Sequence, residues 1–197
     1  MKKYLLTLLC LLTFTQAPAQ ASVLEGTYFG AIGGMNQLKY DQDYFEAYIG
    51  YALGGFCGYK FDNGLRLEGE VSFRRNKMTD SFMVIDDFNE INVDLEMQTK
   101  ITSVMANALY EFCPRSICTP YFGLGIGYAH ISQNGFLEAL GGRAVFRGDT
   151  DQFAWQAILG LNRRLTPDCD FAVEYRYLNP GAHLENHGVV LSLKRFF

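Results

Sequence analysis

The chain has 197 residues, enough for one domain of ordinary size, and its formal charge is −4 at pH 7. This acidic balance excludes the basic stripe with which nucleic-acid-binding proteins hold phosphates, so no nucleic-acid partner is expected. Hydrophobic residues make up 49% of the chain, yet after residue 21 there is no apolar run long enough for a transmembrane helix.

The first 21 residues have the organisation of a secretory signal peptide. Lys2 and Lys3 form a basic region, residues 4–14 are an apolar run too short to span a bilayer, and Ala19-Gln20-Ala21 is a small-x-small cleavage pattern. We therefore predict a cleaved signal peptide at residues 1–21 and one exported domain at residues 22–197.

One stretch, residues 65–73, shows strict alternation. Its odd positions are apolar or small and its even positions are charged or polar, which predicts a strand with two unlike faces. The same alternation recurs along the chain and predicts eight strands. Their ranges are 26–37, 51–61, 65–75, 98–112, 120–132, 153–165, 171–178 and 188–197.

The connections between these strands alternate between short and long. Asp62-Asn63-Gly64 is a tight hairpin signal, whereas residues 77–97 and 134–151 are long stretches without periodicity, predicted as loops. Short periplasmic turns and long extracellular loops are the signature of a transmembrane β-barrel. The predicted fold is therefore all-β, an eight-stranded antiparallel up-and-down transmembrane barrel.

A soluble eight-stranded barrel is the competing fold, and it would place apolar residues inside and charges outside. Two features favour the membrane barrel. Glycines gather on the charged faces of the strands, as a narrow lumen requires, and Tyr and Phe recur at strand ends, as in the aromatic girdles at membrane interfaces.

The faces assigned to the lumen carry charges that balance. Because charges buried in a narrow lumen need partners, we predict a salt-bridge network that plugs the barrel, with Arg176 bound to Glu68 or Glu70 as the first-choice pair. The predicted members are Lys60, Arg66, Glu68, Glu70, Glu111, Glu174, Arg176 and Lys194.

Four cysteines follow the predicted signal peptide, and export permits disulfides. Cys113 and Cys118 flank a short proline-containing turn, which predicts a bridge between them; the pairing of Cys57 and Cys169 stays open. No pattern indicates a zinc site, so no metal or cofactor is expected.

The signal peptide, the eight alternating strands and the terminal Phe197 resemble small bacterial outer-membrane proteins of the OmpA and OmpX kind. Residues 120–128, 153–160 and 171–177 are similar to the surface-antigen barrels of intracellular bacteria. The resemblance implies an outer-membrane location in contact with lipid and lipopolysaccharide. It also implies that Leu191, Leu193 and Phe197 form the signal read by the outer-membrane assembly machinery.

Three functions fit this fold, because a barrel of this kind hosts many activities. The first is a non-enzymatic surface protein (an anchor, adhesin or surface antigen) whose loops 77–97 and 134–151 meet host molecules. The second is a lipid A-modifying enzyme, because His130-x-Ser132 resembles the His-x-Ser pair of the lipid A deacylase barrel; Glu138 follows too closely to match that family's acid. The third is a small porin-like channel.

Overall fold

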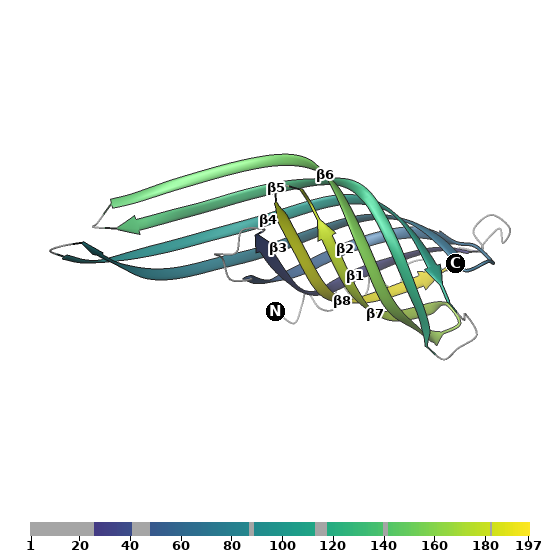
Figure 1. Cartoon of the computed structure of the whole chain (residues 1–197). Helices are drawn as coiled ribbons and strands as arrows, with labels where there is room; N and C mark the ends of the chain where they lie inside the picture. Colours follow the sequence, from purple (N-terminus) through teal and green to yellow (C-terminus); the bar gives the residue numbers. More distant parts are fainter. Residues whose placement is uncertain (1–25, 41–47, 87–88, 113–117, 140–141, 182) are drawn as a thin grey trace, which may run out of the picture.

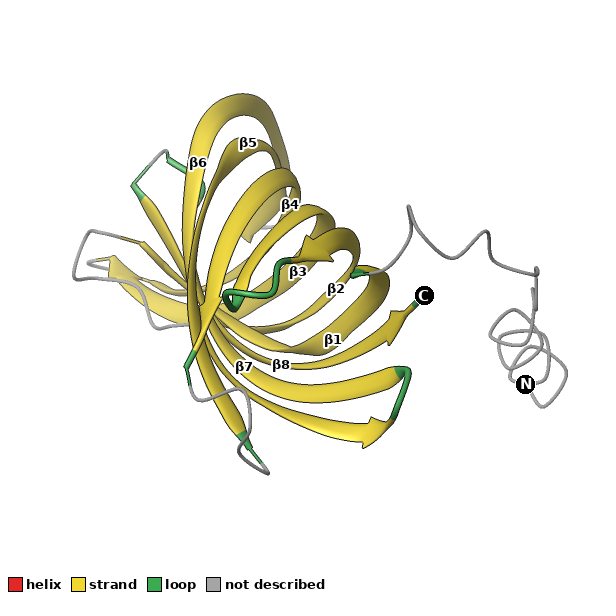
Figure 2. Ribbon diagram, turned by 90° about the vertical axis from the view of Figure 1, so that its right-hand side faces the viewer, coloured by secondary structure: helices red, strands yellow, loops and turns green. Residues whose placement is uncertain are grey.

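The computed structural model describes residues 26–40, 48–86, 89–112, 118–139, 142–181 and 183–197. These residues form eight strands and, within the described ranges, no helix (Figure 2). The predicted signal peptide lies outside them. The strands are β1 (Thr27–Tyr40), β2 (Tyr48–Lys60), β3 (Leu65–Asp86), β4 (Asn89–Glu111), β5 (Thr119–Ala139), β6 (Gly142–Thr166), β7 (Cys169–Asn179) and β8 (Leu184–Phe196).

The strands form one closed antiparallel barrel in chain order (Figures 1 and 2). Each strand pairs with the next, and β8 returns to pair with β1 from Tyr28 opposite Phe196 to Tyr40 opposite Leu184. Within the wall, closure pairs the backbone groups of every strand with those of its neighbours, which a sheet in lipid requires. The predicted eight-stranded up-and-down barrel is therefore confirmed.

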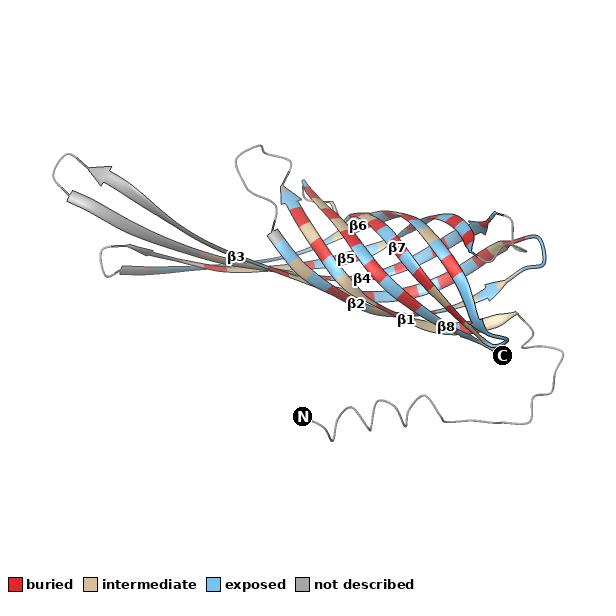
Figure 3. Ribbon diagram, turned by 90° about the horizontal axis from the view of Figure 1, so that it is seen from below, coloured by how far each residue is buried: buried red, intermediate tan, exposed pale blue. Residues whose placement is uncertain are grey.

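The two faces of the barrel wall alternate along the strands in Figure 3. On β3, Arg66, Glu68 and Glu70 are buried inside, whereas Leu67 and Val71 are about half exposed on the outer surface. The same inversion holds on the other strands, so the outer surface is a band of exposed apolar side chains. A soluble barrel would bury this apolar set, so the wall suits lipid.

Residues 77–97 and 134–151 are not the loops that we predicted. Most of each stretch continues the neighbouring strands, so that β3–β4 and β5–β6 form two hairpin arms that project past the rest of the barrel (Figure 1). A ladder with water on both faces needs no apolar face, and residues 144–150 are all exposed. The alternation that signals a membrane strand is therefore absent there.

The opposite end of the barrel carries the short connections and the C-terminus (Figure 1). At the β2–β3 turn Gly64 has φ +86°, a left-handed conformation that favours glycine, and the Asn63 side chain accepts a hydrogen bond from the Leu65 N–H. Across the described residues, no helix has the length and apolarity to cross a membrane.

Candidate functional site

The lumen holds a charged network at the turn end of the barrel. Arg66 donates to Glu111 at 2.7 Å and to Glu68 at 2.8 Å, and Lys60 donates to the other oxygen of Glu111 at 2.6 Å. The Tyr28 hydroxyl donates to Glu68 at 2.7 Å. Each carboxylate in this cluster therefore faces a cation and at least one hydrogen-bond donor, as buried charges require.

A second cluster lies next to the first and is centred on Arg176. This guanidinium binds Glu70 at 2.6 Å and Glu174 at 2.6 Å. Asn107 also donates to Glu70, and Tyr121 donates to Glu174. Arg176 thus pairs with Glu70, one of its two predicted partners, and Glu68 pairs with Arg66 instead.

The Tyr121 ring joins the two clusters. The Arg66 guanidinium lies 4.7 Å from its centroid, and the Lys194 ammonium lies 4.8 Å from it. Lys194 also donates to Asn162 at 3.1 Å. The structure therefore places all eight predicted charged residues in the lumen. We call these eight residues the lumen network.

The structure adds inward-facing groups that the sequence prediction did not include. Arg74 is buried and donates to Ser72 at 3.0 Å and to Ser103 at 3.2 Å, and Asp170 accepts from Asn162 at 2.7 Å. Arg74 and Asp170 lie at positions that continue the period-two alternation from which the other lumen charges were predicted. With Lys60 at its edge, the lumen then holds five cations (Lys60, Arg66, Arg74, Arg176, Lys194) and five carboxylates (Glu68, Glu70, Glu111, Asp170, Glu174).

Towards the arms, a cluster of buried apolar side chains shares the lumen with the charges: Ile101 lies opposite Arg74, and Met105 lies opposite Glu70, in the β3–β4 ladder. We call this cluster the apolar plug; its members are at most 2% exposed. An outer-membrane barrel interior is usually polar, so a buried apolar cluster beside a salt-bridged network opposes the passage of ions. The plug comprises Leu38, Ile101, Met105, Ala129, Ile131, Ala154, Leu178 and Leu184.

The predicted assembly residues lie on the outer face of β8. Leu191, Leu193 and Phe197 are exposed on the outer surface, and the Phe197 ring packs against Phe29 with centroids 5.5 Å apart. The predicted Cys113–Cys118 bridge lies outside the described residues because Cys113 does. The described cysteines, Cys57, Cys118 and Cys169, form no disulfide with one another.

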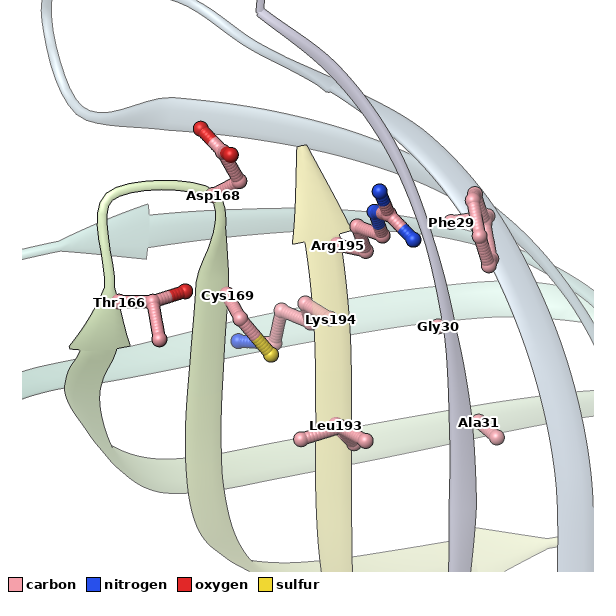
Figure 4. Close-up of a pocket in the computed structure, with 9 residues that line it drawn as sticks. All are labelled: Phe29, Gly30, Ala31, Thr166, Asp168, Cys169, Leu193, Lys194 and Arg195. Carbon is pink, nitrogen blue, oxygen red and sulfur yellow. The ribbon is translucent and has the colours of Figure 1, made fainter. Parts of the chain in front are cut away.

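A groove of about 410 Å³ crosses the turn end of β7, β8 and β1 (Figure 4). Asp168 and Arg195 lie towards the rim, and Leu193 and Ala31 lie further along the wall. Its lining combines lipid-facing apolar groups with rim charges, as at a membrane interface. The lining residues are Phe29, Gly30, Ala31, Thr166, Asp168, Cys169, Leu193, Lys194 and Arg195.

His130 lies on the outer face of β5, one outward position beyond the exposed Tyr128. Its Nδ1 is 2.7 Å from an Asp151 carboxylate oxygen on β6, and both side chains are mostly exposed. Within the described part of the chain, no hydrogen bond joins Ser132 to His130. Glu138, the acid weighed from sequence, has a side chain outside the described residues.

Residues 6–197 match the outer membrane protein β-barrel domain family. The chain belongs to this family. The barrel is accordingly a protein of the bacterial outer membrane, as predicted, and by the family convention its short turns face the periplasm and its arms the outside.

Individual relatives agree with this placement. The outer membrane protein PagN of Salmonella typhimurium is 27% identical over 135 residues, which are 67% of this chain and 56% of PagN. The chain thus spans little more than half the length of this curated relative. Neisserial surface protein A matches with a TM-score of 0.58 and 17% identity, over 87% of this chain and 97% of that one. Ail of Yersinia pestis, solved with the heparin analogue sucrose octasulfate, matches with a TM-score of 0.51 and 19% identity, over 88% and 99%.

Proposed function

We propose that this outer-membrane barrel is a non-enzymatic surface protein in which the wall is an anchor and the two arms meet host molecules. The two arms are the observation that supports this proposal. β3 pairs with β2 only as far as Asn76, and β6 pairs with β7 only from Trp155, so four strands leave the barrel as an open sheet. Val145 and Phe146 on the β6 arm are exposed, which suits contact with a partner.

The charge of the arms indicates the chemistry of that partner. Residues 77–97 hold six acidic residues against one basic residue, and residues 134–151 hold three against two. A sulfated glycan, the class of molecule seen with Ail, would be repelled by such arms. A basic segment of a host protein fits them better, and its association would weaken as salt rises.

An arm-deletion variant tests this proposal. Residues 78–97, which hold the six acidic residues of the β3–β4 arm, are replaced by Asn-Gly, which joins the paired residues Lys77 and Gln98 by a two-residue hairpin. Bacteria carrying this variant are expected to bind host cells several-fold less than bacteria carrying the full chain, with unchanged barrel folding by heat-modifiable gel migration. A matched control replaces the exposed Arg163 with Gln at the periplasmic end. Equal binding by the arm-deletion variant and the full chain would refute the proposal.

One observation favours a second function, the hydrolysis of a lipid ester. The Asp151 carboxylate is hydrogen-bonded to His130, as the acid of a catalytic triad is to the histidine base. Ser132 is the next outward residue on β5. If this pair activates Ser132, purified protein will release fatty acid from lipid A and Ser132→Ala will abolish the release. Absence of release by the native protein removes this function and leaves the surface protein.

We also propose the partners implied by the wall. The exposed apolar band would contact outer-membrane lipid and lipopolysaccharide, and Leu191, Leu193 and Phe197 would be read by the assembly machinery. Phe197→Ala is expected to lower the amount of folded barrel in the membrane several-fold in cells while leaving refolding in detergent unchanged. An equal loss in detergent would show that Phe197 acts through packing on Phe29 instead.

A further inference from the structure

The outer face of β3 and β4 changes from apolar to basic over a short distance. Towards the arm, the outward positions of β3 are Val71, Phe73, Arg75 and Lys77. Phe73 belongs to the aromatic girdle, with its ring centroid 6.2 Å from that of Tyr51. Because outward residues recur about every 7 Å along a strand, Arg75 lies just beyond the apolar layer, where lipid headgroups begin.

β4 brings a second cation to the same level. Its outward positions run from Val104 through Thr102 to Lys100, and Lys100 lies directly opposite Arg75 in the β3–β4 ladder. Like charges in directly opposite positions of a sheet repel each other. The barrel therefore places two cations side by side at the membrane surface, where the wall could have carried polar uncharged residues.

Neither cation is neutralised by the protein within the described residues. No carboxylate there contacts Arg75 or Lys100; the other ladder neighbour of Arg75 is Tyr51, and that of Lys100 is Ser132. The Arg75 Nε is buried and has no hydrogen-bond partner. By contrast, Lys77 lies 3.8 Å from Glu96. The pair thus presents two positive charges that no carboxylate of the described residues neutralises.

We infer that Arg75 and Lys100 bind a phosphate group of a lipid in the outer leaflet. A phosphomonoester carries a charge between about −1.5 and −2, which matches two cations, and it accepts the forked donors of arginine in a bidentate manner. Val71, Phe73 and Val104 lie directly below on the same face and would contact the acyl chains of that lipid. The adjoining girdle favours a membrane lipid over a soluble anion.

The test uses the full chain refolded into vesicles that contain lipid A with its phosphates or phosphate-free lipid A. After transfer into detergent, the lipid retained by the protein is measured by native mass spectrometry. The native chain is expected to retain phosphorylated lipid A at least 10-fold more than the phosphate-free form, since each basic residue at a membrane surface contributes appreciably to anionic-lipid binding. Arg75→Gln with Lys100→Gln removes this preference.

A matched control removes two other exposed basic residues. Lys39 lies on the outer face of β1 opposite Glu185, and Arg163 lies near the periplasmic turns, so Lys39→Gln with Arg163→Gln keeps the preference. Folding of every variant is checked by heat-modifiable gel migration. Equal retention of the two lipid A forms by the native chain, or the same loss in both double variants, would overturn the inference.

Discussion

At the residue scale, Arg176 shows how the lumen network stabilises the barrel. Its guanidinium is the shared partner of Glu70 and Glu174, all three side chains being nearly fully buried. Removing one member of such a set leaves uncompensated charge away from water. The network therefore stabilises the barrel only while every buried charge is paired. Removing one charged side chain destabilises the barrel more than replacing the whole set.

Arg176→Met tests this dependence. It leaves two buried carboxylates without their cation and should destabilise the barrel by about 3–5 kcal/mol in urea unfolding from lipid vesicles. Arg163→Gln, a change of the same charge at an exposed position, should stay within about 0.5 kcal/mol of the native chain. Equal stabilities for both variants would show that the ion pairs contribute little.

Inward glycines make room for the large side chains of the network. A Cβ on Gly160 would clash with the Tyr121 ring, whereas a Cβ on the outward Gly69 would meet nothing within 4 Å. Gly160→Ala should therefore cost about 1–3 kcal/mol, since Tyr121 must move away from Glu174, and Gly69→Ala should be close to neutral. Urea unfolding of the two variants measures the difference. A neutral Gly160→Ala would mean that the lumen is loosely packed.

Sequence alone located most of the lumen charges, but not their contacts. Alternation on β3 assigns Arg66, Glu68 and Glu70 to the interior and, carried four residues beyond Glu70, would have assigned Arg74 as well. The roles of Tyr28 and Tyr121 depend on which strands face each other across the lumen. That relation is set by the stagger of the closed sheet, which no local pattern contains.

At the element scale, the arms extend four strands without taking part in the wall. Their residues were predicted as loops because a ladder with water on both faces does not alternate, so period two marks the membrane part of a strand and not its full length. The turns at the other end were predictable because Asp62-Asn63-Gly64 has the chemistry of a tight hairpin.

The arms should be dispensable for folding. Replacing residues 78–97 by Asn-Gly joins the paired residues Lys77 and Gln98 and leaves the wall and the lumen network intact. We expect the variant to refold in detergent and to migrate as a folded barrel on unheated gels, with stability within about 1 kcal/mol of the full chain. Failure to refold would show that the β3–β4 arm nucleates or supports the wall.

At the scale of the whole molecule, the filled lumen argues against a channel. Apart from Lys60 at the edge of the lumen, the side chains of the lumen network and of the apolar plug are buried. Purified protein in planar bilayers should therefore give no stable conductance. Large, long-lived channel openings would contradict the sealed lumen and favour the porin-like alternative.

The orientation of the barrel in the membrane decides whether the arms can meet a host at all. Single cysteines at Thr150, on the β5–β6 arm, and at Asn63, in the β2–β3 turn, are introduced into a chain whose own cysteines are serine. Intact cells are then treated with a membrane-impermeant maleimide. The cysteine at position 150 should be labelled on intact cells and the cysteine at position 63 only after lysis. Labelling of position 63 but not 150 on intact cells would place the arms in the periplasm and contradict a surface-presenting barrel.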